Sequence, residues 1–259
     1  MSAFGSENVL AALSACSRHG FAAIEAFADT SLIFAERPDE FRTLMEISGV
    51  RLAGLHAGGV LTASEFHAAE IAEWERMLDW VRDVGADYAA YYGGERSNDP
   101  VADVASAASL LTAIGRAANL RGVAFCYEPD RRSPFGTRQS LARLLALTEP
   151  AVVRLSVDTA HLACTEIDPA RFIAEHASRI HVVHVRDVGG PGTPDISRDG
   201  FVDPGAGVVD LGSVRDSLRA MGYDGWVVGV VARPHVAPQK SVEHTARFFR
   251  DSMWLQLAV

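Results

Sequence analysis

Apolar residues follow two different spacings, which alternate along the chain from one end to the other. Stretches with apolar residues three or four positions apart predict amphipathic helices, whereas short alternating or continuously apolar stretches predict strands. Helices are predicted at residues 6–20, 41–47, 67–84, 99–120, 141–147, from 168 onward, 213–221 and 242–248. Strands are predicted at residues 21–27, 51–55, 88–92, 123–127, 151–158, 180–187 and 226–231. Ser6 and the Asp99-Pro100 pair are predicted caps of their helices.

Seven predicted strands with helices between them indicate an all-parallel sheet. At 259 residues, the chain has the usual length of one closed barrel of this kind. We therefore expect a single α/β domain over residues 1–259, a (β/α)8 TIM barrel. Only residues 1–6 precede the first helix, so the first strand is expected to be short or missing. An open seam invites pairing, and we expect a second copy of the chain to cover it as a homo-oligomer.

Residues 151–161 show the clearest strand, with polar groups on one face only. The two faces carry Val153, Leu155 and Val157 against Arg154, Ser156 and Asp158. In a barrel, the aliphatic face would meet the helices and the polar face would line a site. Asp158 ends the strand and His161 follows in the next turn, which suits cation binding. A helix-capping aspartate beside a solvated histidine explains the same pair, and the stretch by itself leaves both interpretations open.

Composition excludes several classes of partner. The net charge is −9 and no basic run could track a phosphate backbone, so nucleic acid is not expected as a partner. The three cysteines have no CxxC spacing, which argues against disulfides and thiolate zinc sites. No signal-like start or apolar stretch of spanning length is present, so we expect a cytoplasmic protein without membrane contact.

Carboxylates and imidazoles collect where the predicted strands end. The end positions carry Glu25, His56, Glu128, Asp158 with His161, and His184 with Arg186 and Asp187. Barrel enzymes place their functional groups at these ends. Glu128, Asp158 and His184 end consecutive strands and are expected to converge, although each alone is also typical of a hydrogen-bonded barrel residue. Together they suit Mn²⁺, Mg²⁺, Co²⁺, Fe²⁺ or Zn²⁺.

A long segment at residues 189–207 follows the strand that carries His184. It is rich in Gly, Pro and Asp and shows no periodicity. Such loops in compact domains are usually lids or binding loops. We expect it to cover the barrel mouth and to become less mobile when ligand binds.

Five short motifs occur in an order that resembles the xylose-isomerase-like barrel superfamily. They are Glu128-Pro, Asp158-Thr-Ala-His161, the stretch RIHVVHVRD at 179–187, GAGVVD at 205–210 and GYDGW at 222–226. The resemblance covers about residues 20–250. It implies sugar and sugar-phosphate isomerases and epimerases, inosose and dehydroshikimate dehydratases, or apurinic endonucleases.

The resemblance also implies roles for individual residues. Glu128, Asp158 and His184 would be three metal ligands, with Glu128 also acting in proton transfer. His161 would polarise the substrate, and Arg186 stands in the place of the common lysine. With these two, Glu25, His56 and Asp187 complete the set of residues expected to bind substrate.

The chain departs from the family pattern on the last strand. Members usually carry a glutamate four residues after the tryptophan, and here Val230 stands at that place. Valine neither binds a metal nor moves a proton. We therefore expect a metal held weakly, or with water in the fourth position. The endonuclease option weakens too, because its extra ligands are not evident and the chain is acidic.

These observations predict a metal-dependent isomerase or epimerase-family enzyme acting on a sugar, ketose or cyclic polyol through an enediolate. Because Val230 removes one of two acid–base groups, dehydration of a keto-polyol by a lyase is the second interpretation. A barrel that has lost catalysis and serves as a binding protein is the third. Metal content separates the enzymes from the binding protein, and product analysis separates the two enzymes.

Overall fold

The computed structural model describes residues 8–93, 104–191, 200–230 and 237–253. Seven main strands run through it: β1 (Ala23–Phe27), β2 (Arg51–Gly59), β3 (Tyr88–Gly93), β4 (Ala124–Glu128), β5 (Arg154–Asp158), β6 (Ile180–Val185) and β9 (Trp226–Gly229). The helices are α1 (Val9–Arg18), α2 (Ala28–Ile33), α3 (Pro38–Ser48), α4 (His67–Val84), α5 (Val104–Leu120), α6 (Arg138–Leu147), α7 (Thr159–Ala163), α8 (Pro169–Glu175), α9 (Leu211–Ala220) and α10 (Pro238–Phe248). Short helical turns η2 (Ser64–Phe66), η3 (Ala177–Arg179) and η4 (Phe249–Met253) complete the elements named here.

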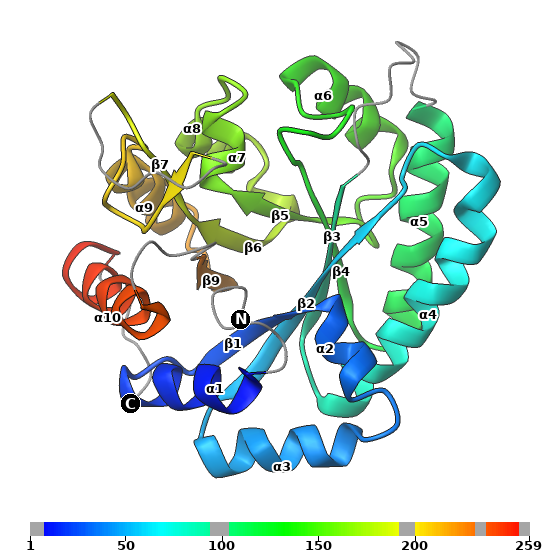
Figure 1. Cartoon of the computed structure of the whole chain (residues 1–259). Coiled ribbons are helices and arrows are strands. Elements are labelled where there is room, and N and C mark those ends of the chain that lie inside the picture. Colours follow the sequence, from blue (N-terminus) through cyan, green and yellow to red (C-terminus); the bar gives the residue numbers. More distant parts are fainter. Residues whose placement is uncertain (1–7, 94–103, 192–199, 231–236, 254–259) are drawn as a thin grey trace.

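The seven main strands form one sheet in the order β1-β2-β3-β4-β5-β6-β9. Every pairing in it is parallel. The sheet curls into a nearly closed barrel with the helices around it (Figure 1). The predicted α/β TIM-barrel fold is confirmed. Among the described residues β1 and β9 are not paired, so a seam lies between them, as the short first strand predicted. Whether another chain covers it stays a prediction.

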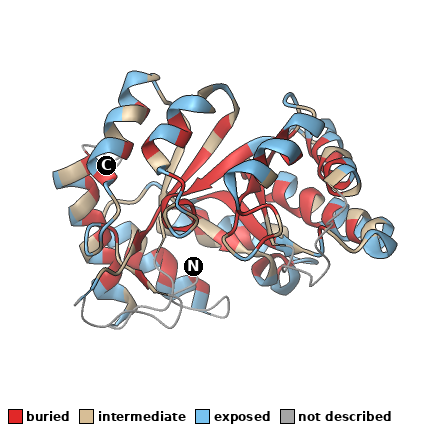
Figure 2. Cartoon of the chain, turned by 90° about the horizontal axis from the view of Figure 1, so that it is seen from above, coloured by how far each residue is buried: buried red, intermediate tan, exposed pale blue. Residues whose placement is uncertain are grey.

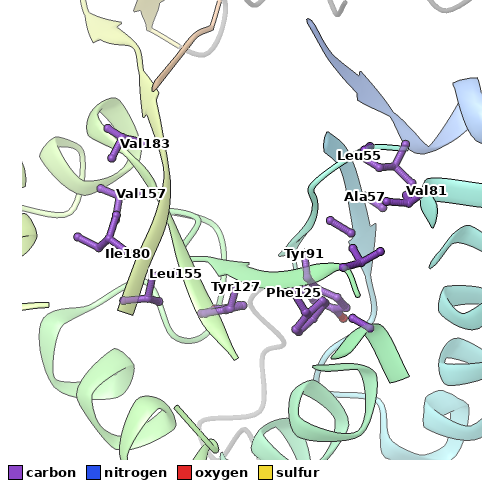
Figure 3. Close-up of a cluster of buried hydrophobic side chains, with 14 of the residues drawn as sticks. Leu55, Ala57, Val81, Tyr91, Phe125, Tyr127, Leu155, Val157, Ile180 and Val183 are labelled. Atoms are coloured by element: carbon purple, nitrogen blue, oxygen red, sulfur yellow. The ribbon is translucent and has the colours of Figure 1, made fainter. Parts of the chain in front are cut away.

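Most of the hydrophobic core lies between the strands and the surrounding helices. Buried strand residues such as Leu55, Phe125, Leu155 and Val183 belong to this layer (Figure 3), and the helices turn their exposed faces outward (Figure 2). A second, smaller cluster lies on the other face of the strands. It contains Ala53, Tyr88, Ala90, Cys126 and Val182, with Trp226 and Val228 packed against it.

Strand β5 confirms the predicted division of its two faces. Leu155 and Val157 belong to the outer core. Ser156 and Asp158 are buried and polar, and the Ser156 hydroxyl donates to Glu128 on the neighbouring strand β4. Arg154 is exposed at the start of the strand, where its guanidinium donates to the Ser178 carbonyl. The polar lining therefore begins at Ser156.

Strand β2 continues four residues beyond the predicted end. Two glycines at the end of a stretch usually indicate that a strand has ended, but here Gly59 belongs to the strand because close packing requires it. A Cβ on Gly59 would lie 1.8 Å from Glu70 Oε1 and 2.3 Å from the Tyr91 hydroxyl. His56 consequently lies inside a strand and not at a loose end, so its backbone is held on both sides.

The polypeptide after β6 differs from the prediction. The strand ends at Val185, and the two-residue strands β7 (Asp187–Val188) and β8 (Phe201–Val202) then pair antiparallel. The predicted aperiodic loop therefore contains a small hairpin. Residues 192–199, the Ser6 cap and the Asp99-Pro100 cap lie outside the described residues. No helix in the described part of the chain has the length and apolar character needed to cross a membrane.

Candidate active site

Glu128 lies at the centre of a buried polar cluster at the end of β4. Its Oε1 lies 3.2 Å from His56 Nε2, and its Oε2 lies 2.5 Å from His184 Nδ1. The Ser156 hydroxyl also donates to Oε2, at 2.8 Å. Burial opposes ionisation of this carboxyl group. The charges and hydrogen bonds of His184 and His56 outweigh that effect and hold the pKa of Glu128 well below its usual range.

His184 lies between two carboxylates that come from opposite parts of the chain. Its Nδ1 faces Glu128, and its Nε2 lies 2.8 Å from Oε1 of Glu25 on β1. Burial would lower the pKa of this imidazole, but Glu25 and Glu128 raise it well above its ordinary value. Burial likewise opposes the charge on Glu25, yet His184, His56 and a hydrogen bond from Tyr88 lower its pKa. In the metal-free cluster, a charged imidazolium therefore bridges two carboxylates.

Aromatic rings hold the imidazole of His56 in place. It stacks on Tyr92, with ring centroids 4.5 Å apart, and it lies 5.5 Å from the Phe27 ring. The His184 ring meets its edge at 5.2 Å. His56 is 6 % exposed, so its orientation depends on these rings and on Glu128 and not on solvent.

Asp158 caps a helix and faces the site at the same time. Its Oδ1 accepts the backbone N–H groups of Ala160 and His161, so it is the N-cap of α7. The capping interpretation of the 151–161 stretch therefore holds for Asp158, and cation binding by this residue stays a prediction. Its Oδ2 lies 3.0 Å from Arg186 Nε, an ion pair whose angle does not make a hydrogen bond.

His161 lies in helix α7 and is buried, so the predicted turn and the solvated alternative are both wrong. Its Nδ1 accepts a hydrogen bond from the Arg131 backbone N–H at 3.4 Å. The same nitrogen lies 3.8 Å from Asp130 Oδ1. Its ring also meets Phe201 of β8 edge-on at 5.2 Å.

Phe201 brings the described part of the 189–207 segment against the site. Guanidinium groups of Arg186 and Arg131 lie over its ring, 4.7 and 4.9 Å from the centroid. Phe201 therefore lies against residues at the strand ends, while the covering of the mouth by this segment and its mobility stay predictions. The sequence did not single out Phe201, although it is the one aromatic residue in a Gly- and Asp-rich stretch.

Asp187 is committed to the backbone of that segment. Its two oxygens accept N–H groups from Val188, Gly205, Gly207 and Val209, at 2.8 to 3.1 Å. A Cβ on Gly207 would lie 2.4 Å from Oδ1, so this close approach requires glycine. The described contacts give Asp187 a structural role, and its contact with substrate remains only a prediction.

Two groups of three side chains could each hold a divalent ion, and Glu128 belongs to both. One is His56, Glu128 and His184; the other is Glu128, Asp158 and His161, with potential ligand atoms within 4.8 Å of one another in each. Imidazole and carboxylate donors fit such an ion, and the buried Asp158 Oδ2 has no hydrogen-bond partner in the described structure. Among the described residues, the predicted trio of Glu128, Asp158 and His184 is not a further group that meets this 4.8 Å limit.

On the last strand, Val228 packs with the inner cluster, and Gly229 points outward, where a Cβ would lie 2.4 Å from Thr245 Cγ2 of α10. Glycine at this position therefore accommodates a helix. Alternation places Val230 on the inner side.

Comparison with known proteins agrees with this geometry. The model of the xylose isomerase-like TIM barrel family matches residues 13–252. An inosose dehydratase of Geobacillus kaustophilus (strain HTA426) is 24% identical over 248 residues, 83% of this chain and 80% of that protein. Further inosose dehydratases match over less than half of their length.

Two solved structures share the fold. The probable 3-DHS dehydratase AsbF of Bacillus anthracis has a TM-score of 0.79 at 12% identity, covering 93% of both chains. The IOLI protein with a binding zinc atom has a TM-score of 0.78 at 17% identity, covering 95% of this chain and 92% of that one. The expectation of an enzyme is confirmed, because the relatives are named as dehydratases. The chain belongs to the xylose isomerase-like TIM barrel family.

Proposed function

We propose that the protein is a dehydratase that eliminates water from a keto-polyol, with a cyclic inosose as the first substrate to test. One observation carries this choice: carboxylates and imidazoles surround Glu128, whereas Val230 occupies the place of a second acid–base carboxylate. Inversion of a stereocentre needs proton carriers on both faces of the substrate, but elimination needs them on one. Dehydration is therefore preferred to the isomerase or epimerase activity predicted first. The names of the dehydratase relatives support the same choice.

Glu128 is the base in this proposal. Its carboxylate lies at the end of β4 in contact with His56 and His184, and in this proposal it accepts the proton on the carbon next to the ketone. The electrons of that C–H bond form the new double bond. A divalent ion held by Glu128 and its neighbouring imidazoles would supply a Lewis acid, which would polarise a ketone oxygen and make this proton more acidic.

His161 is the acid in this proposal. In this proposal the protonated His161 side chain gives its Nε2 proton to the departing hydroxyl, and Asp130 Oδ1 lies 3.8 Å from its Nδ1. The C–O bond breaks and the hydroxyl leaves as water. The proton on Glu128 then passes to His161, so both groups regain their starting protonation states and atoms and charges balance. Phe201 and Arg186, which are 6 and 8 % exposed, lie on this side of the site.

Product analysis tests the function. The parent protein, supplied with a divalent metal and an inosose in deuterated water, should give a product lighter by one water. His161→Asn should lower the rate at least about 100-fold, the lower range for a lost acid–base group. His176→Asn is the matched control, because this histidine packs on Phe172 at the end of α8. A product that has lost no water and carries solvent deuterium at an inverted or isomerised carbon would refute the proposal.

A further inference from the structure

The side chain of Arg186 lies just after strand β6 and is 8 % exposed. Its buried Nε–H has no hydrogen-bond partner in the described structure. Asp158 Oδ2 faces this nitrogen at 3.0 Å, but the angle of the ion pair does not make a hydrogen bond. A buried donor without an acceptor costs free energy, and a charged donor costs more. The side chain is therefore suited to a ligand that brings its own oxygens.

The backbone of Arg186 is fixed by Thr159 of α7. The Arg186 N–H donates to the Thr159 hydroxyl at 3.0 Å, and that hydroxyl donates to the Arg186 carbonyl at 2.5 Å. Thr159 itself is fully buried. The guanidinium is therefore carried by a rigid point at the end of β6, as the precise binding of a ligand requires.

Phe201 fixes one face of the guanidinium. The centroid of its ring lies 4.7 Å from the central carbon of Arg186 and 4.9 Å from that of Arg131. The same ring meets the His161 imidazole edge-on at 5.2 Å. A guanidinium that lies over an aromatic ring keeps its N–H donors in its own plane. Arg186 therefore presents a planar set of donors close to the imidazole that acts as the acid in the proposed function.

An oxyacid group is the ligand chemistry that fits this guanidinium. Its fork of N–H donors matches the two oxygens of a carboxylate or a phosphate, and such charged pairs bind more strongly than neutral ones. The hydroxyl groups of a neutral polyol would give weaker single bonds. Asp158 does not supply a two-oxygen partner, because its Oδ1 accepts the N–H groups at the start of α7.

We propose that the substrate carries an anionic oxyacid group and that Arg186 binds this group, which makes Arg186 a specificity-determining residue. The inference rests on the proposed function, since it names the substrate class of the same site: a keto-polyol acid in preference to a neutral inosose. A carboxylate fits best, because it is planar like the guanidinium. Arg186 moves no proton, since its side chain stays protonated.

Three sugars that share one pyranose ring and differ only at carbon 6 test the inference. Glucuronate carries a carboxylate there, glucose 6-phosphate a phosphate and glucose a neutral hydroxymethyl group. In calorimetric titrations of the full-length chain, glucuronate should bind about 10–100-fold tighter than glucose, the range for a hydrogen bond to a charged group. Arg186→Met should abolish this preference, and Arg186→Lys, which keeps the charge without the fork, should retain part of it. Arg116→Lys is the matched control, because this exposed arginine pairs with Glu149 and should keep the preference of the parent.

The preference for an acid separates a specificity role from a structural one. If Arg186→Met weakened the binding of all three sugars alike and kept the preference, the inference would be overturned. A parent that binds glucose as tightly as glucuronate, or binds no glucuronate, would overturn it without any variant. Tighter binding of glucose 6-phosphate, lost in Arg186→Met, would support the oxyacid site and assign it to a phosphate. Dehydration of an inosose by a parent without the preference would refute this inference alone, whereas the preference without dehydration of any keto-polyol would refute only the proposed function.

Discussion

Replacing Asp187 with asparagine tests whether this residue holds the 189–207 segment in place or contacts the substrate. The carboxylate accepts from Val188 and Val209 on one oxygen and from Gly205 and Gly207 on the other. An amide keeps one accepting oxygen and turns its NH₂ group toward the remaining N–H donors. Two lost bonds to a charged acceptor, at about 1.5–3 kcal/mol each, predict a destabilisation of about 3–6 kcal/mol. The lower end applies if the segment detaches and its N–H groups reach water.

Two measurements separate the outcomes. Amide exchange in residues 200–209 should become faster in Asp187→Asn, and the urea midpoint should fall with it if the segment unfolds together with the barrel. Because Phe201 would lose its support beside His161, the KM for substrate should also rise. Asp203→Asn in the same segment is the matched control, since its side chain has no hydrogen bond among the described residues. Unchanged exchange and urea midpoint with a higher KM would refute the anchor role and support a direct substrate contact.

Three further predictions concern the barrel interior and its last strand. The metal-free protein should be most stable between about pH 4.5 and 6.5. Below this range it loses stability as acid protonates Glu25 and Glu128, whose pKa values are lowered, and above it as His184, whose pKa is raised, deprotonates. Urea unfolding across pH should show both losses, and His184→Asn should reduce the loss at alkaline pH. Val230→Glu should tighten zinc binding and introduce deuterium exchange at the carbon that epimerases invert, both measurable beside the parent; equal affinity in the two proteins would contradict an inward-facing position 230. Gly229→Ala should cost about 1–3 kcal/mol by overpacking against α10, whereas a urea midpoint equal to the parent's would show that the helix moves away freely.

The strand ends were predictable because their signals are local. Hydrophobic period and chain length are enough to predict seven parallel strands, and a parallel barrel brings their carboxyl ends to one side. That argument placed Glu128 and His184 correctly beside each other. It could not place Gly59 inside a strand, because the reason for that glycine is the Glu70 side chain that packs against it. The hairpin at Phe201 was missed for a similar reason, since two-residue strands have no period to detect.

Partnerships between side chains were decided by the tertiary structure. Glu25 and His184 are 159 positions apart and meet only because the first and sixth strands approach each other across the barrel interior. Asp158 and His184 occupy paired positions on neighbouring strands, yet Asp158 faces Arg186, whereas His184 and His56 both contact Glu128. The sequence by itself determined the barrel, the residue types at its mouth and the missing carboxylate at Val230, because spacing and residue identity suffice for these. Which of those residues form one site depended on strand tilt and ring packing, which set distances of a few ångströms that no sequence period encodes.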